Sequence, residues 1–347
     1  MKVKDYEITL LYNKNYYREF LTNPINIKLS NNIATNAYGC SLDNIFIIFE
    51  SKSYILYLIY SSLNKSIIAF NLNKMQIVCE IKKAHNDYID NFRHIYDLKN
   101  KRDIILSLSS GDNNIKIWDI NNWNCIHNIN NIYKVGIILS ACFLINEMDN
   151  FIITCNCFLY NIIVIDFEGN KIKEFPDSSN YTIFIDTYFD IQKNKYYIIT
   201  GNKNNVKSYD FNTNNLYYTY EDKFSSHHRS VIINNNNDDE IIKIIFPSEE
   251  GFISIFNFHS GNILNKINFI HEALLSLCLW NNDFLFVGGR NKTINLINLK
   301  KGEIVKKNVG HNHWICSIKK VDILNFGECL ITQGLDNKIK LWAINNE

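Results

Sequence analysis

The sequence predicts an all-β fold made of seven repeated units, each a meander of four antiparallel strands. Two observations lead to this fold class. The 347 residues include 20 Tyr and 22 Phe but only three Pro, and Ile and Asn are abundant, so residues that favour strands alternate with residues that suit tight turns. In addition, a short pattern of the form IKIWDI, residues 115–120, recurs along the chain at near-constant intervals.

The recurring pattern has seven copies. With the position of Trp118 as the reference, the copies are centred on Phe70, Trp118, Ile165, Tyr209, Phe256, Ile297 and Trp342, and successive copies are 41 to 48 residues apart. Repeats of this length are typical of proteins in which each repeat is one supersecondary unit that stacks on its neighbours. The spacing therefore predicts one continuous array of seven units.

Each copy contains the same order of expected strands. The first strand is a run such as ICSIKKV (315–321), and the second is a run such as FLFVGG (284–289). The recurring pattern itself forms the third strand, and a short polar turn leads to an alternating run such as NNWNCIHNI (121–129), which forms the fourth.

The seventh copy, GHNHWICSIKKVDILNFGECLITQGLDNKIKLWAINN, resembles a WD repeat, the unit of WD-repeat β-propellers. The resemblance implies a single seven-bladed β-propeller of four-stranded antiparallel blades over residues 1–347. It also implies a structural network of hydrogen bonds among a His, a Ser or Thr, an Asp and the Trp of the repeat. In the seventh copy these residues are His311, Thr332, Asp336 and Trp342.

The second copy keeps three of these four residue types. His85, Asp112 and Trp118 occupy the corresponding positions, but the register of the seventh copy places Leu108 where the hydroxyl belongs. We therefore expect the network of the second copy to be incomplete.

The last copy ends without a fourth strand, and an unpaired strand edge there would expose backbone donors and acceptors. The alternating run DYEITLLY, residues 5–12, precedes the first complete unit. We expect residues 1–12 to complete the seventh blade, as in WD-repeat propellers generally, with 33–347 as the seven repeats. Residues 13–32 are expected to be a connecting segment, and a partner-binding arm is the alternative.

Charge and apolar patterning exclude several classes of protein. The formal net charge is +1, with 36 basic and 35 acidic residues, so no basic surface for nucleic acid is expected. The longest apolar stretch, residues 45–60, is interrupted by Glu50 and Lys52 and predicts no membrane span. The nine cysteines follow no spacing framework, which indicates reduced thiols and a location in the cytoplasm or the nucleus.

No catalytic or cofactor motif is apparent. Cys155 and Cys157 lie close together, but no second ligand pair at a suitable spacing completes a zinc site. Gly288 and Gly289 lack the Lys-Ser/Thr sequel of a phosphate-binding loop. The sequence therefore predicts a protein that is not an enzyme and that carries neither metal nor cofactor.

The remaining candidate is a surface that binds other proteins or peptides. Tyr88 and Trp314 each follow a structural His by three residues, and Asn86, His313 and Arg290 are expected on the same face. Large aromatic side chains dominate many interfaces. We expect a non-catalytic scaffold or adaptor of an intracellular complex. Three alternatives remain: a substrate receptor of a ubiquitin-ligase assembly, an enzyme that uses the central channel, or packing of the two aromatic side chains into the blade edges.

Overall fold

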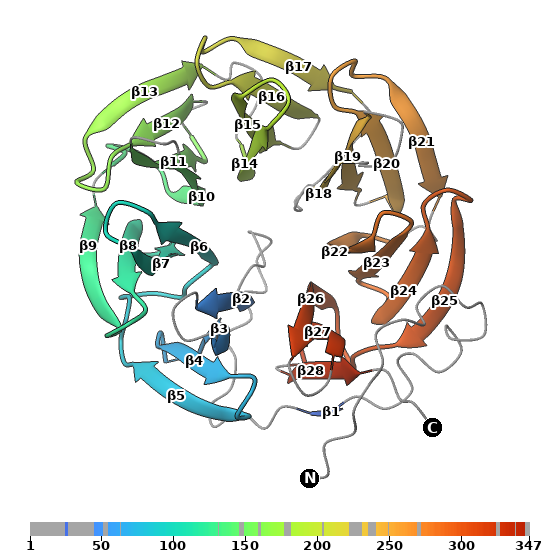
Figure 1. Ribbon diagram of the computed structural model, residues 1–347, viewed down its shortest axis with the longest axis horizontal. Coiled ribbons are helices and arrows are strands. Elements are labelled where there is room, and N and C mark those ends of the chain that lie inside the picture. The colour runs from blue at the N-terminus through green and yellow to red at the C-terminus, as the bar shows by residue number, and fades with distance from the viewer. Residues whose placement is uncertain are drawn as a thin grey trace.

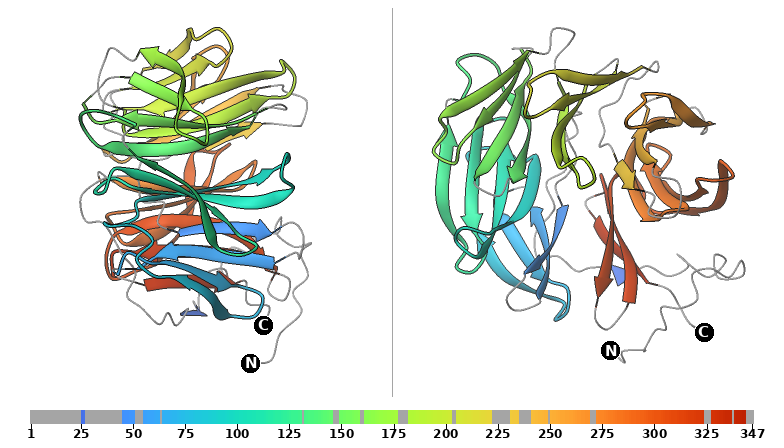
Figure 2. Two further views of the ribbon diagram at one scale, coloured as in Figure 1. Left: turned by 90° about the vertical axis from the view of Figure 1, so that its left-hand side faces the viewer. Right: turned by 45° about the horizontal axis from the view of Figure 1, so that its top comes forward.

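Seven antiparallel sheets of four strands surround a central axis (Figure 1). The computed structural model describes residues 25–26, 45–50, 55–62, 64–130, 132–145, 149–158, 161–176, 182–202, 205–221, 231–234, 241–248, 250–268, 272–323, 327–336 and 338–343, and in these ranges every regular element is a strand. Side views show the blades stacked side by side into a ring (Figure 2). The chain is therefore a seven-bladed β-propeller, as the sequence predicted.

The blades are numbered in chain order. Within each blade, the strands are given in order from the one nearest the central axis to the one at the rim (Figure 1). Blade 1 contains β2 (Ile45–Glu50), β3 (Ile55–Ser61), β4 (Ile67–Asn71) and β5 (Gln76–Ile81). Blade 2 contains β6 (Asn91–Asp97), β7 (Arg102–Ser109), β8 (Asn114–Asp119) and β9 (Asn124–Asn130). Blade 3 contains β10 (Ile138–Ile145), β11 (Asn150–Asn156), β12 (Asn161–Ile165) and β13 (Lys171–Pro176). Blade 4 contains β14 (Phe184–Asp190), β15 (Lys195–Gly201), β16 (Val206–Asp210) and β17 (Leu216–Tyr220).

The remaining three blades follow the same plan. Blade 5 contains β18 (Val231–Asn234), β19 (Ile242–Pro247), β20 (Phe252–Asn257) and β21 (Ile263–Asn268). Blade 6 contains β22 (Leu274–Asn281), β23 (Phe284–Gly289), β24 (Thr293–Asn298) and β25 (Glu303–Val309). Blade 7 contains β26 (Ile315–Ile323), β27 (Gly327–Gly334) and β28 (Lys338–Ala343), and its fourth strand is β1 (Ile25–Asn26).

Burial differs between the middle strands and the rim strands, and this difference explains their sequence patterns. Every residue of β4, β16 and β23 is buried, because these strands are covered on both faces by neighbouring blades. By contrast, β5 alternates between exposed and half-buried residues. Continuous burial therefore marks the inner part of a blade, with an apolar run in β23, and alternating burial marks its rim.

The core lies between the blades. Seven clusters of buried apolar side chains each join two adjacent blades, including one that joins blade 7 to blade 1. In that last cluster Leu58 and Phe70 of blade 1 pack with Ile331 and Leu341 of blade 7. In the described part of the chain, adjacent sheets thus bury their facing sides against one another.

The Asp or Asn that follows the reference residue of the repeat stabilises the turn from the third to the fourth strand. Asp210 Oδ1 accepts hydrogen bonds from the backbone N–H groups of Asn212 (2.9 Å) and Thr213 (3.1 Å). Asn257 and Asn298 make the same pair of bonds in blades 5 and 6. Short polar side chains are favoured at such positions because they reach their own backbone two residues on.

The same turn contains one residue in the left-handed region in each of blades 1 to 6. These residues are Met75, Trp123, Gly169, Asn214, Gly261 and Gly302, with φ between 54° and 90°. Three of the six are glycine, which adopts this conformation without the steric cost of a Cβ atom.

An N-terminal strand completes the last blade, but its position differs from the predicted one. The closing strand is β1, which pairs antiparallel with β28 through Ile25 opposite Leu341 and Asn26 opposite Lys340. It lies within 13–32, the range predicted as a connecting segment. Residues 1–12, which were predicted to close the ring, lie outside the described residues.

Candidate functional site

One face of the ring is formed by the connections that lead into the blades and by the turns between the second and third strands. In blade 2 the backbone N–H of Asn86 donates to Asp112 Oδ2 at 2.8 Å, and in blade 7 the N–H of Asn312 donates to Asp336 Oδ2 at 2.9 Å. Each of these bonds joins a connection to a turn. We call this the histidine face, because its connections 82–90 and 310–314 carry His85 and His311.

In blade 7, four side chains form one continuous network. The distance from His311 Nδ1 to Asp336 Oδ1 is 2.9 Å, and His311 Nε2 lies 2.8 Å from Thr332 Oγ1. Trp342 Nε1 donates to the same Thr332 oxygen at 2.8 Å. The consistent proton arrangement has His311 donating to Asp336 through Nδ1 and accepting the Thr332 hydroxyl proton at Nε2.

Blade 2 contains an equally complete network, so the expectation of an incomplete one was wrong. His85 Nε2 lies 2.7 Å from Ser107 Oγ, to which Trp118 Nε1 donates at 2.8 Å, and His85 Nδ1 lies 3.1 Å from Asp112 Oδ2. The hydroxyl comes from Ser107 and not from position 108. The reason is a turn that is one residue longer: Ser107 pairs with Lys116 across the hairpin just as Thr332 pairs with Lys340.

Blade 3 uses a different residue for the same connection. The hydroxyl of Tyr133, in the segment that leads into the blade, lies 2.8 Å from Thr154 Oγ1 on β11, and both side chains are buried. Thr154 lies as far before Ile165 as Ser107 lies before Trp118. This role of Tyr133 was not predicted from the sequence, because a His was sought before each blade. A Tyr that bonds to the hydroxyl at the position of Ser107 or Thr332 does not fit that pattern.

The acidic members of the two networks are held in their charged form. Burial opposes ionisation of Asp336, but the N–H of Asn312 and the nearby His311 outweigh it, so the pKa of Asp336 lies below its usual value. The pKa of Asp112 is lowered in the same way by His85 and the N–H of Asn86. The pKa of His311 is also lowered, chiefly by burial.

Around the blade 2 network, the connection presents Tyr88 to solvent. The side chain of Tyr88 is 40% exposed, and its backbone N–H donates to Asp87 Oδ1 at 2.8 Å. The ammonium of Lys65, in the neighbouring turn of blade 1, donates to the carbonyl oxygen of Asn86 and lies 3.9 Å from Asp87 Oδ1. A Cβ atom on Gly111 would lie 2.2 Å from Asp87 Oδ2, so a larger residue there would displace the Asp87 side chain.

Around the blade 7 network, three of the predicted residues form a second group. Arg290 Cζ lies 4.5 Å from the centroid of the half-buried Trp314 ring, which is the geometry of a cation–π contact. The backbone N–H of Trp314 donates to His313 Nδ1 at 2.8 Å. Both His313 and Arg290 are exposed.

Tyr88 and Trp314 lie where the chain enters blades 2 and 7, the two blades next to blade 1, whereas Arg290 lies in the turn between β23 and β24 of blade 6 (Figure 1). Among the residues that the structure describes, no contact joins the Tyr88 group to the Trp314 group. That these residues form one partner-binding patch stays a prediction. Asn86 contributes its backbone to the fixed loop, and Arg290 covers one side of Trp314.

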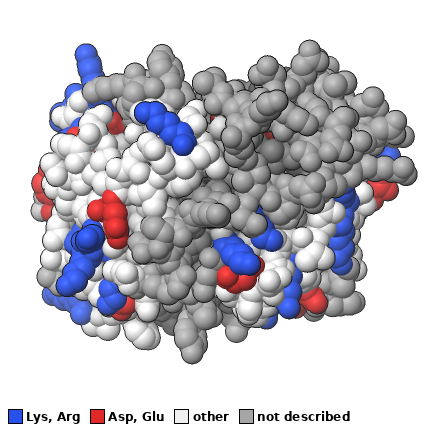
Figure 3. All heavy atoms as spheres, turned by 90° about the horizontal axis from the view of Figure 1, so that it is seen from below, with Lys and Arg blue, Asp and Glu red and all other residues white. Residues whose placement is uncertain are grey.

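Basic and acidic side chains are interspersed on the surface seen in Figure 3. Within the described ranges, no three His, Cys, Asp or Glu side chains are grouped as they would be to hold a metal ion. No helix in those ranges is long and apolar enough to span a membrane. No protein-family model matches the chain, and no curated protein matches it either.

Proposed function

We propose that this protein is a divergent WD-repeat propeller that acts as a non-catalytic interaction scaffold in an intracellular multiprotein complex, in the cytoplasm or the nucleus. The WD-repeat assignment is supported by the two networks, which contain the His, hydroxyl, Asp and Trp groups of that repeat at corresponding places in blades 2 and 7. A propeller hosts many functions, so the scaffold role must be argued from the surface.

One observation supports the scaffold role: an exposed tyrosine lies on a loop whose backbone is held by hydrogen bonds. Tyr88 is 40% exposed, while Asn86 before it is held by Asp112 and Lys65. After it, Asp90 accepts a hydrogen bond from the backbone N–H of Ser110 at 2.7 Å. A side chain that is already ordered loses little conformational entropy when it is covered by a partner. Trp314 with Arg290 provides a second aromatic group on the same face, of the kind that is enriched at interfaces.

The test is quantitative affinity purification from native extract. The bait is the wild type, the double variant Tyr88→Ala/Trp314→Ala, or the control Ile191→Ala. Ile191 is 77% exposed in the turn between β14 and β15, on the face opposite the histidine face. We expect a stoichiometric set of proteins with wild type and control, and at least about a tenfold loss of that set with the double variant.

Equal thermal unfolding of the three baits shows that the variants are folded. A stoichiometric set that the double variant retains in full contradicts the assignment of the face. The absence of any stoichiometric partner for the wild type contradicts the scaffold role itself.

A further inference from the structure

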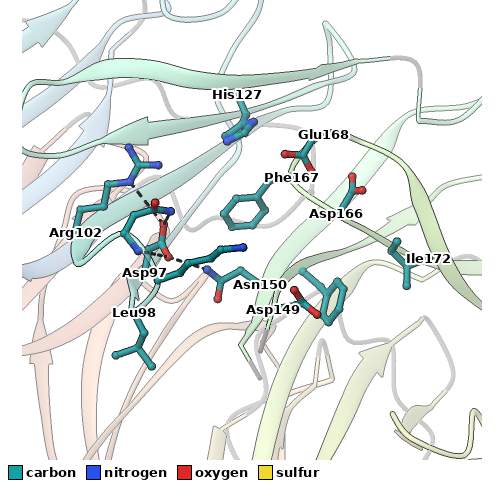
Figure 4. A pocket seen from close by; sticks show the side chains of 13 residues that line it. Asp97, Leu98, Arg102, His127, Asp149, Asn150, Asp166, Phe167, Glu168 and Ile172 are labelled. Carbon is teal, nitrogen blue, oxygen red and sulfur yellow. Dashed lines mark hydrogen bonds and ion pairs between the residues drawn. The ribbon is translucent and has the colours of Figure 1, made fainter. Parts of the chain in front are cut away.

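A pocket of about 420 Å³ opens between blades 2 and 3 on the face opposite the histidine face. Its residues come from the turn between β6 and β7, the start of β11, and the turn between β12 and β13. Figure 4 shows the ring of Phe167 at its centre, with Asp97 and Arg102 to one side and Asp149 and Ile172 to the other. We call it the 2–3 pocket. Its volume falls within the range of ligand-binding pockets.

The walls of the 2–3 pocket are held by contacts within the propeller. Buried Asp97 accepts hydrogen bonds from Asn100 Nδ2 (2.7 Å) and Asn150 Nδ2 (3.1 Å), so the turn of blade 2 is joined to β11 of blade 3. The ring of Phe167 lies edge-on to His127 at a centroid distance of 5.6 Å and contacts Phe143 at 5.8 Å. The pocket therefore exists before any ligand binds.

Part of its mouth is apolar. The side chain of Leu98 is 64% exposed and that of Ile172 is 47% exposed, and both line the pocket together with the half-buried rings of Phe151 and Phe167. Single exposed apolar residues are common on protein surfaces, but here four line one cavity, where together they can contact an apolar group of a ligand.

The charged side chains around the apolar part of the mouth are mostly negative. Asp149, Asp166 and Glu168 line the pocket, and in the described structure no Lys or Arg forms an ion pair with any of them. Asp166 accepts hydrogen bonds from the backbone N–H and Nδ2 of Asn170 at 2.7 and 2.9 Å. Because Asn170 is neutral, these bonds do not compensate the charge of Asp166. Lys99 is the other charged group at the mouth.

The remaining charges of the pocket compensate one another. Arg102 lies 3.6 Å from Asp97 Oδ2 and 3.2 Å from Asp119 Oδ2. Among the described residues, three carboxylates without an ion pair thus line the pocket together with one lysine, which leaves an excess of negative charge that suits a cationic group.

We propose that the 2–3 pocket binds a short basic segment of another protein, in which an aromatic or aliphatic side chain stands next to Lys or Arg. The apolar side chain contacts Phe167, Leu98 and Ile172, and the cation lies among the three carboxylates. This site is on the opposite face from Tyr88 and Trp314, so it does not depend on the role proposed for the histidine face.

The test is fluorescence anisotropy with purified full-length protein and short labelled peptides. One peptide carries a Phe between two Lys residues, the second carries Glu in place of both Lys, and the third carries Ser in place of Phe. We expect the first peptide to bind about tenfold more tightly than either of the others, because each of the others lacks one of the two complementary groups.

Variants locate the site. Asp149→Asn/Glu168→Gln removes two charges without changing side-chain size, and we expect it to weaken binding of the Lys-Phe-Lys peptide about fivefold. The matched control, Glu221→Gln/Glu272→Gln, removes two exposed carboxylates elsewhere and is expected to bind as wild type. Leu98→Ala should also weaken binding, whereas Ile191→Ala, at the corresponding position of blade 4, should not.

Three results would overturn the proposal: equal binding of the Lys and Glu peptides, an equal loss of affinity in the control double variant, or no binding of the first peptide. The variant Tyr88→Ala/Trp314→Ala should bind the peptide as wild type does. A negative result for the histidine face in the affinity purification is thereby distinguished from a negative result for peptide binding to the 2–3 pocket.

Discussion

In blade 7, the hydroxyl of Thr332 lies between two buried nitrogen atoms, His311 Nε2 and Trp342 Nε1. Thr332→Val keeps the volume but leaves the Trp342 N–H without an acceptor and His311 Nε2 without a donor. Because unsatisfied buried polar groups are costly, we expect this substitution to lower the free energy of unfolding by about 1–3 kcal/mol. Urea denaturation measures the change.

The control is Thr332→Ser, which retains the oxygen and should lose less stability. Ser107→Ala makes the corresponding test in blade 2, where Ser107 has the same two neighbours. Equal losses for the Val and Ser variants of Thr332 would show that the methyl group, and not the hydroxyl, stabilises the blade.

Protonation of the same network should weaken the fold. The pKa of buried His311 lies below its usual value of about 6.5, so the unfolded chain binds a proton there more readily than the folded chain does. The stabilisation is therefore complete above about pH 6.5 and declines below it. His94 and His259 have pKa values shifted in the same direction, chiefly by burial, and they add to this decline.

At lower pH the carboxylates follow. The pKa of Asp336 is lowered by its hydrogen bonds and by His311 against the opposing effect of burial, so its contribution is present above about pH 4 and is lost as the pH falls further. We expect the urea midpoint to fall between pH 7.5 and 5.0 and again towards pH 3.5. A constant midpoint between pH 7.5 and 5.0 would contradict the shift of the histidines.

At the scale of single elements, the turns between the third and fourth strands differ in how much space they leave. A Cβ atom on Gly261 would lie 2.9 Å from Tyr218 Cδ1, whereas on Gly302 its nearest neighbour is Asn265 Nδ2 at 3.5 Å. Both residues have positive φ. Gly302→Ala should therefore lower the free energy of unfolding by about 1 kcal/mol, the cost of a left-handed backbone conformation for a residue with a Cβ atom. Gly261→Ala should lower it further, because the Tyr218 ring must also move.

Thermal unfolding monitored by circular dichroism compares the two variants. If Gly302→Ala is as destabilising as Gly261→Ala, contact with Tyr218 has no effect and the backbone conformation alone decides the loss.

The elements also show which features a sequence pattern can predict. The reference position of the repeat is buried in β16, so it keeps a large side chain there, which makes the repeat recognisable even where Trp is replaced by Tyr209. The role of Ser107 was missed because turn length is not constrained by burial, and one additional residue shifted the register. The 2–3 pocket was missed because its residues come from polar turns of two blades, whose proximity depends on the fold.

For the whole molecule, closure of the ring rests on contacts between residues far apart in the sequence. Side chains of blades 1 and 7 share one apolar cluster, and β1 adds a fourth strand to blade 7. The repeat predicted the number of blades and the need for a closing strand, because β28 would otherwise have a free edge. The segment predicted to close the ring, residues 1–12, lies outside the described residues, and the pairing of Ile25–Asn26 with β28 was not predicted, because a two-residue strand has no alternating pattern that could be recognised.

Two N-terminal truncations distinguish the segments. Removal of residues 1–12 retains β1, whereas removal of residues 1–26 exposes the backbone of β28 that Ile25 and Asn26 cover. We expect the longer truncation to lose about 1–3 kcal/mol more of the free energy of unfolding, since it gives up the strand pairing and leaves an open edge. Urea denaturation and the onset of aggregation, measured side by side, report both effects. If the shorter truncation already shows the full loss, closure depends on residues 1–12 and the pairing of β1 with β28 is not what fastens the ring.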